Sequence, residues 1–178
     1  FTGEVSTQML KSLGIEYVII GHSERREFFS EDNKTLYDKV KLSLANNITP
    51  IFCCGETLEV RNKGTHKDFV LSQLQETIYN LNSDGFSKVI IAYEPIWAIG
   101  SGMTASGEDI QEMHSAIRSS IKTKYGSAIS RNTSILYGGS VKPINAKDIF
   151  DLEDVNGGLI GGASLVANDF FDIVNSIS

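Results

Sequence analysis

Short, continuous apolar runs separated by helical patterns constrain the fold of this sequence more than any other feature. Five such runs are expected to be strands, at residues 17–20, 50–53, 89–92, 134–137 and 158–160. Each run is apolar throughout rather than alternating with polar residues. That pattern is typical of a parallel sheet whose two faces are both covered, because alternation is expected only where one face meets water. The runs therefore predict a parallel sheet.

Amphipathic helical patterns fill the intervals between the apolar runs. Ser6 can cap a short helix that Gly14 closes, and Ser106 with Asp109 has the arrangement of a capping box. Apolar side chains recur at helical spacing at Leu36, Val40 and Leu44 after Ser30, at Val70, Leu74, Ile78 and Leu81, at Ile110, Met113, Ile117 and Ile121, and within 145–152 and 168–177. A helix followed by five strand–helix units is an α/β fold with right-handed crossovers.

Two architectures accommodate this order of elements: an open doubly wound sheet, or part of a (β/α)8 TIM barrel. A complete barrel takes about 250 residues, whereas this chain has 178 residues and five predicted strands. Five strands cannot close a barrel, so the barrel interpretation makes the chain about the last five βα units, with roughly three units missing before Phe1. No linker divides the sequence, and residues 1–178 are expected to form a single domain, an incomplete barrel.

Composition and charge exclude several classes of protein. The 16 basic and 22 acidic residues give a net charge of −6 and form no basic stripe, which argues against nucleic-acid binding. No apolar run reaches the roughly 18 residues that a membrane-spanning helix needs. Cys53 and Cys54 are neighbours with no other cysteine to pair with, which favours a reducing compartment. His22, His66 and His114 lack metal-ligand spacing, so no metal site is expected.

Glu94 and His22 are the main candidates for chemistry, because each follows an apolar run and working groups in parallel α/β folds lie just past the strand ends. A carboxyl group partly removed from water has a raised pKa and can act as a base, and Pro95 restricts Glu94 to an extended conformation. His22 precedes a helix start at Ser23, where the helix dipole disfavours imidazolium and leaves a neutral hydrogen-bond donor. The alternatives are a polar residue that only marks a strand end and a capped surface histidine, the commoner state of a lone histidine.

Glycine clusters follow two consecutive predicted strands, at 138–139 before Ser140 and at 161–162. Free backbone N–H groups at helix starts bind phosphate, and glycine lets an anion approach closely. The alternative is a pair of tight turns that need positive φ angles.

A third glycine-rich segment, residues 100–105, matches the dinucleotide pattern Gly-x-Gly-x-x-Ala. It begins too far after its strand, however, and no acidic residue near position 125 is placed to hold a ribose. A glycine-rich tip between firmer ends at 95–97 and 103–105 is typical of a lid, with a plain loop as the alternative.

Together these segments resemble the triosephosphate isomerase family. The stretch Tyr93-Glu94-Pro95-Ile96-Trp97-Ala98-Ile99-Gly100-Ser101-Gly102 is similar to the signature and lid of that family. Residues 1–6, 21–26, 137–140 and 161–165 match further motifs in the family's order and spacing, so the resemblance covers essentially all 178 residues.

The resemblance implies a TIM-barrel enzyme that moves a proton between adjacent carbons of dihydroxyacetone phosphate and glyceraldehyde 3-phosphate, a step of glycolysis and gluconeogenesis, without a cofactor. It makes Glu94 the base and His22 the neutral electrophile that polarises the carbonyl and stabilises the enediolate. It assigns the substrate phosphate to the backbone at Gly100, Ser140, Gly161 and Gly162, under a lid that excludes water.

The resemblance has further implications beyond the reacting groups. Glu24 resembles a supporting partner of a catalytic lysine, and Cys53 resembles the family's buried cysteine. Residues 1–4 resemble a loop that docks beside the active site of a twin subunit, which implies a cytoplasmic homodimer. The family's first strands, with the Asn and Lys that contact substrate, are absent from these residues, so the chain alone is expected to be inactive or severely impaired. Ser101 and Met103 stand where Thr and Lys are commoner in the family.

Two other functions stay open at this point. Another phosphate-binding barrel could use Glu94 for different chemistry, but that hypothesis does not explain why His22 and the lid pattern occur together. A non-catalytic module, such as a truncated barrel, is the third hypothesis.

Overall fold

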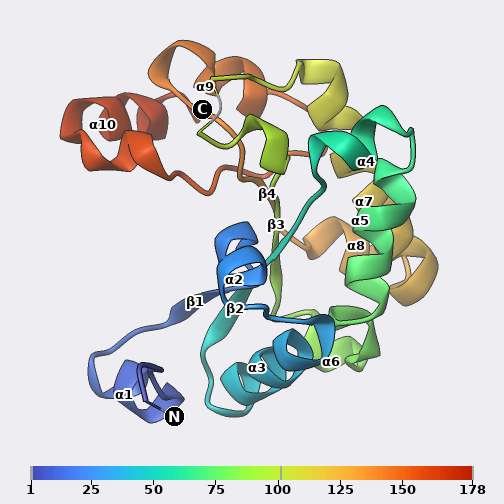
Figure 1. Cartoon of the computed structure of the whole chain (residues 1–178), viewed down its shortest axis with the longest axis vertical. Coiled ribbons are helices and arrows are strands. Elements are labelled where there is room, and N and C mark those ends of the chain that lie inside the picture. The colour runs from blue at the N-terminus through green and yellow to red at the C-terminus, as the bar shows by residue number, and fades with distance from the viewer. Residues whose placement is uncertain (1, 101, 178) are drawn as a thin grey trace.

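The computed structural model describes residues 2–100 and 102–177, in which parallel strands alternate with helices (Figure 1). The strands are β1 (Tyr17–Ile20), β2 (Thr49–Cys54), β3 (Ile90–Tyr93) and β4 (Ile135–Tyr137). The helices are α1 (Thr7–Ser12), α2 (Ser23–Phe28), α3 (Asn33–Ala45), α4 (Leu58–Asn62), α5 (His66–Gln75), α6 (Ser83–Phe86), α7 (Gly107–Tyr125), α8 (Ser127–Asn132), α9 (Pro143–Phe150) and α10 (Ala167–Asn175). Short 3-10 turns lie at η1 (Ile78–Asn80), η2 (Ile96–Ala98) and η3 (Gly162–Leu165).

The strands lie in one sheet in their order along the chain, β1-β2-β3-β4, and every adjacent pair is parallel. A doubly wound sheet reverses its strand order at one point, and the described strands show no such reversal. Each crossover therefore advances to the next position in the same direction, as it does around a barrel. The sheet is an α/β arrangement consistent with part of a TIM barrel, which decides between the two predicted architectures.

The predicted fifth strand at 158–160 is wrong as a full strand. The segment lies beside β4 through an isolated parallel bridge between Tyr137 and Gly158, and the Tyr137 amide donates to the Gly157 carbonyl at 2.9 Å. Gly157 has a φ of 141°, outside the strand region, and two adjacent glycines supply no side chains to pack against the sheet. The chain follows the path of a fifth strand but keeps little of its pairing.

Helix boundaries follow the local signals with one exception. Ser6 caps α1, and the capping box of Ser106 and Asp109 begins α7. Asp32, two residues after Ser30, caps α3. The helix expected to run from Val70 to Leu81 ends at Gln75 and gives way to η1, because the Thr77 backbone leaves the helical region at φ −123° and ψ −100°.

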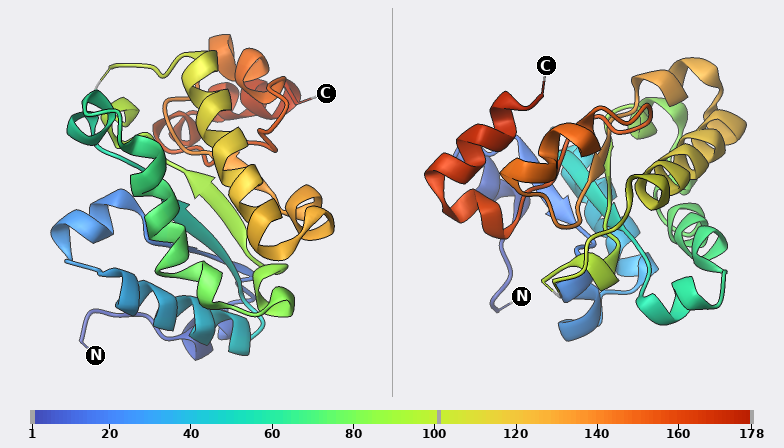
Figure 2. Two further views of the ribbon diagram at one scale, coloured as in Figure 1. Left: turned by 90° about the vertical axis from the view of Figure 1, so that its right-hand side faces the viewer. Right: turned by 90° about the horizontal axis from the view of Figure 1, so that it is seen from above.

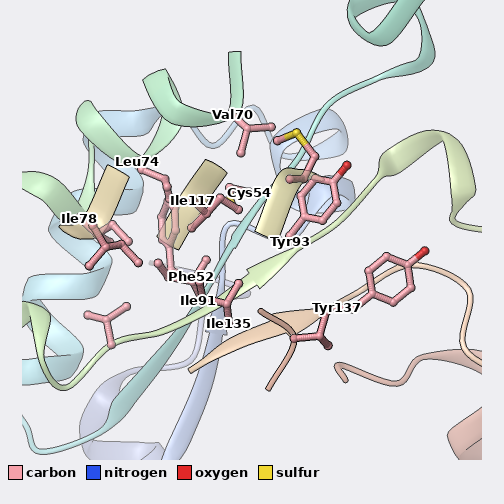
Figure 3. Close-up of a cluster of buried hydrophobic side chains, with 14 of the residues drawn as sticks. Phe52, Cys54, Val70, Leu74, Ile78, Ile91, Tyr93, Ile117, Ile135 and Tyr137 are labelled. Atoms are coloured by element: carbon pink, nitrogen blue, oxygen red, sulfur yellow. The ribbon is translucent and has the colours of Figure 1, made fainter. Parts of the chain in front are cut away.

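The helices α3, α5 and α7 cover the sheet and supply most of its apolar partners. In Figure 2, α5 and α7 run side by side across the strands. Figure 3 shows Phe52, Ile91 and Ile135 of three adjacent strands beside Leu74 of α5 and Ile117 of α7, and all five side chains are fully buried. Within the described residues no helix combines the length and the apolar character needed to cross a bilayer.

Candidate active site

The ends of β1, β2 and β3 lie at one level and bring their following residues together. Ile20 pairs with Phe52, and Cys54 pairs with Tyr93, so His22 and Glu94 both leave the sheet at its carboxyl edge. The Glu94 amide donates to the Cys54 carbonyl at 2.8 Å, which continues the pairing one residue past β3. The register alone therefore directs the two predicted residues to the same rim.

His22 and Glu94 are in direct contact. Nε2 of His22 lies 3.2 Å from Oε1 of Glu94, and the amide of Ser23 donates to Oε2 of the same carboxyl group at 3.2 Å. The Glu94 residue is only 2% exposed, whereas the His22 side chain is 32% exposed. The carboxyl group is thus held from one side by the imidazole and the first amide of α2.

The N-terminal position of His22 on α2 selects its tautomer. Nδ1 of His22 accepts the amide N–H of Glu24 at 3.3 Å, so that its lone pair is occupied by the helix cap. In the neutral ring the proton must then be on Nε2, the nitrogen that faces Glu94. His22 consequently presents an N–H donor at the rim of the sheet.

Burial raises the pKa of the Glu94 carboxyl group above its ordinary value. His22, the Ser23 amide, Cys53 and Arg26 favour the ionised form and oppose this shift, but they do not cancel it. A carboxylate with a raised pKa is a stronger base than a solvated one, which suits it to take a proton from a weakly acidic group.

A cavity of about 560 Å³ opens on this pair. The other predicted site residues Gly100, Ser140, Gly161 and Gly162 also line it. Residues from the ends of β1, β3 and β4, from the lid segment and from the segment after the bridge at Gly158 thus meet around one space. The lid residue Ser101 lies outside the described residues.

The glycines of the two clusters around this cavity do not form the tight turns with positive φ angles that were considered above. None of Gly138, Gly139, Gly161 and Gly162 has a positive φ. A Cβ on Gly138 would lie 2.9 Å from Cγ of Glu94, and one on Gly139 would overlap the Tyr137 hydroxyl group. Gly161 and Gly162 have nothing within 4 Å of that position and border open space. Two glycines therefore make room for Glu94 and Tyr137, and two leave backbone accessible from the cavity.

Glu24 is placed differently from the other predicted site residues. Its amide donates to Nδ1 of His22, but its carboxylate is exposed, lies outside the cavity lining and bonds to no described side chain. Cys53 is fully buried, and its thiol lies close enough to Glu94 to affect the pKa of that carboxyl group.

Two residues near the site escaped the sequence analysis. Lys142 lines the cavity from the N-terminus of α9, and its place two residues after Ser140 in the same loop was the available signal. Arg26 joins two strand ends, because Nε donates to the Gly21 carbonyl at 2.8 Å and Nη2 donates to the Cys53 carbonyl at 3.0 Å. No local pattern announces that contact. Across the described ranges no His, Cys, Asp and Glu side chains group in a way that could hold a metal ion.

Comparisons with known proteins identify the family of the chain. The sequence profile described as triosephosphate isomerase matches residues 1–177. The chain belongs to the triosephosphate isomerase family. It is 60% identical over 176 residues to the triosephosphate isomerase of Cytophaga hutchinsonii, a match that covers 99% of this chain and 70% of the relative. It is 53% identical over 178 residues to that of Bacteroides fragilis, covering 100% and 70%, and 49% identical over 175 residues to that of Lactobacillus delbrueckii subsp. lactis, covering 98% and 69%.

Membership of the triosephosphate isomerase family agrees with the predicted fold and class of enzyme. The relatives extend over a length of which this chain spans about 70%. Identity near 50–60% over almost the whole chain makes the parallel sheet and its helices a portion of a TIM barrel and the protein an isomerase.

Proposed function

We propose that this chain carries the proton-transfer centre of a triosephosphate isomerase, with Glu94 as the base and His22 as the electrophile. The family interconverts dihydroxyacetone phosphate and glyceraldehyde 3-phosphate. The carboxylate of Glu94 removes a proton from one carbon of the substrate and returns it to the neighbouring carbon. Nε2–H of His22 donates a hydrogen bond to the carbonyl oxygen, which stabilises the negative charge of the enediolate.

The single observation that carries this proposal is the contact between Nε2 of His22 and Oε1 of Glu94 at 3.2 Å, on the wall of the cavity. A base and a hydrogen-bond donor so close together can serve adjacent atoms of one small substrate. The helix cap on Nδ1 supports a neutral ring in the required tautomer. Burial of the carboxyl group supports a base of adequate strength.

The remainder of the cavity suits the phosphate group of such a substrate. Backbone N–H groups at Gly100, Ser140, Gly161 and Gly162 bind the phosphate, and the three glycines have no side chain in the way. The segment from Pro95 to Ala105 acts as a lid that excludes water while the enediolate is present. No organic cofactor takes part in a proton transfer of this kind.

The same family resemblance supports a proposal for the assembly. The protein acts as a homodimer in the cytoplasm, with the loop at residues 2–4 beside the active site of the twin subunit; Phe1 of that loop lies outside the described residues. Residues 1–178 act as one incomplete barrel domain. Glu24 supports a substrate-binding lysine that comes from outside this chain.

Replacing the base tests the catalytic assignment. In the protein that contains this chain and the remaining length of its relatives, Glu94→Gln keeps the shape of the side chain but removes its basicity. We expect kcat to fall by ~10²- to 10⁴-fold with little change in KM. The matched control is Glu59→Gln, because the Glu59 side chain is 77% exposed and contacts Lys63 at the C-terminal cap of α4. An unchanged kcat for Glu94→Gln would refute the role of this residue.

A further inference from the structure

Arg61 of α4 has no role in the proposed chemistry, yet its side chain contacts several groups near the candidate site. Nη1 lies 3.2 Å from Oε1 of Glu56, Nη2 contacts Oδ1 of Asp109, and Nη2 lies 3.9 Å from Oε2 of Glu112. The guanidinium carbon also stands 5.2 Å from the centre of the Trp97 ring. The Arg61 side chain is only 13% exposed and its partner Glu56 is fully buried, whereas Asp109 and Glu112 are partly exposed.

The first carboxylate that Arg61 contacts is that of Glu56, which follows β2 and is fully buried. Its Oε1 accepts hydrogen bonds from the Tyr93 hydroxyl at 3.0 Å and from the Trp97 indole at 2.9 Å. Its backbone carbonyl accepts the amide of Ile96 at 3.1 Å. Glu56 therefore fastens the residues on both sides of Glu94. A buried carboxylate is costly without a cation, and Arg61 supplies that cation by direct contact.

The second carboxylate that Arg61 contacts is that of Asp109, in the first turn of α7. Its Oδ2 accepts the Ser106 amide at 3.2 Å and the Ser106 hydroxyl at 2.8 Å, which completes the capping box. The other oxygen, Oδ1, is free to contact Arg61. One carboxyl group thus joins the start of α7 to the same guanidinium that holds Glu56.

We propose that Arg61 is a positioning residue for the isomerase reaction. It holds Trp97 and Ser106, the two ends of the segment that follows Glu94, at a fixed separation through Glu56 and Asp109. A planar guanidinium can bind two carboxylates at defined angles while it stacks on an indole ring, and a lysine ammonium cannot do all three. The inference rests on the function proposed above, because the segment matters to catalysis only if Glu94 is the base.

Kinetics of two Arg61 variants test the proposal in the full-length protein. We expect Arg61→Ala to lower kcat by ~10- to 100-fold, because the base and the lid ends lose their common anchor and small misplacements are costly. Arg61→Lys restores the charge beside Glu56 without the second contact, so its kcat should be intermediate. Lys63→Ala, at the C-terminal cap of α4, is the control, since Lys63 is exposed and pairs only with Glu59 among the described residues.

The indole N–H resonance of Trp97 gives a second measurement that does not depend on turnover. Arg61→Ala and Glu56→Gln should both shift this resonance relative to the unchanged protein, whereas Lys63→Ala should not. Trp97 is the only tryptophan in the 178 residues, and Trp97→Phe assigns the signal if the remaining chain contains another. If Arg61→Ala does not fold, Asp109→Asn weakens one contact and should still shift the resonance and lower kcat severalfold.

A lowered Tm with unchanged kcat, KM and indole resonance would overturn the proposal and leave Arg61 a structural residue. The proposed function has a separate test, because it requires kcat to fall in the Glu94→Gln variant. If the resonance shifts in the Arg61 variant but Glu94→Gln is fully active, Arg61 still holds Trp97 in place. The contact would then have no link to proton transfer, and the catalytic part of the inference would be overturned.

Discussion

His22 and His114 show at the scale of single residues how one neighbouring atom sets the chemistry of an imidazole. Nδ1 of His22 accepts an amide N–H, which leaves the proton on Nε2. Nδ1 of His114 faces the Asp154 carbonyl at 3.3 Å, which can only accept, so the proton must be on Nδ1. His114 is fully buried on α7, and its Nε2 has no hydrogen-bond partner among the described residues. One ring can donate to a ligand, and the other is fixed as a neutral part of the core.

His114 should make the stability of the protein depend on pH. Burial, helped by the charge of Arg118 and partly opposed by Asp154, lowers the pKa of His114 from 6.5 to about 4. The unfolded chain therefore binds a proton near pH 6.5 that the folded chain does not bind until about pH 4. Stability is fully present above pH 6.5 and is lost as the pH falls toward 4, by roughly 3 kcal/mol in total.

Urea unfolding near pH 7 and near pH 5 measures this effect. Over that interval the wild type should lose about 2 kcal/mol more than His114→Gln, since glutamine does not titrate and the remaining groups contribute equally to both proteins. Equal losses in the two proteins would show that folding does not shift the pKa of His114.

At the scale of elements, close backbone approach joins β2 to β3 next to the site. Gly55 directly follows β2, its amide donates to Oε1 of Gln73 at 2.9 Å, and its carbonyl accepts Nε2 of Gln73 at 3.2 Å. A Cβ at this position would overlap the backbone carbonyl oxygen of Glu94. The glycine is required by the nearness of a second strand, and α5 locks it in place through Gln73.

Gly55→Ala should therefore damage both stability and catalysis. The overlap falls on backbone, which cannot rotate away, so β2 and β3 must separate at the point where Glu94 is held. We expect a loss of about 2–3 kcal/mol in the free energy of unfolding, together with a lower kcat in the folded fraction. Gly107→Ala is the control, because its Cβ would meet only Leu152 Cδ2 at 3.8 Å and alanine favours the helix. A Gly55→Ala protein as stable as the control would contradict this account.

At the scale of the whole molecule, one strand and one helix expose large apolar side chains to solvent. Tyr17 and Ile19 of β1 are 54% and 47% exposed, although strands of a parallel sheet are normally covered on both faces. Among the described strands β1 pairs only with β2, which leaves the other side of β1 as an open edge. Phe170, Phe171 and Val174 of α10 are also exposed, on a helix whose opposite side packs through the buried Ile173. Exposed apolar faces and an open strand edge promote association.

The 178-residue chain expressed by itself should consequently self-associate and show little isomerase activity. Sedimentation at several protein concentrations measures the association, and binding of a hydrophobic dye reports the exposed faces. We expect kcat/KM at least ~100-fold below that of the full-length protein, because the site also needs the substrate-binding Asn and Lys expected from the family resemblance. Turnover near that of the full-length protein would contradict the requirement for those residues.

Local sequence was sufficient for most of the elements and for selecting the candidate site residues. Apolar runs located four strands, capping residues located the starts of α1 and α7, and position after a strand end selected His22 and Glu94. These features depend on neighbours a few residues away, so they can be recognised without the fold. The helix expected to continue to Leu81 failed because Thr77 leaves the helical region, and the strand expected at 158–160 failed because glycine pairs weakly.

Only the tertiary structure decided how these elements meet. Strand order excluded the doubly wound sheet, and the parallel register brought the Ser23 amide to Glu94, 71 residues further along the chain. The roles of Arg26, Gly55 and Arg61 likewise depend on contacts between separate elements. Such contacts arise when the whole sheet packs against its helices. The distance between two residues that are far apart in the sequence is set by that packing, so it cannot be inferred from any short segment of sequence.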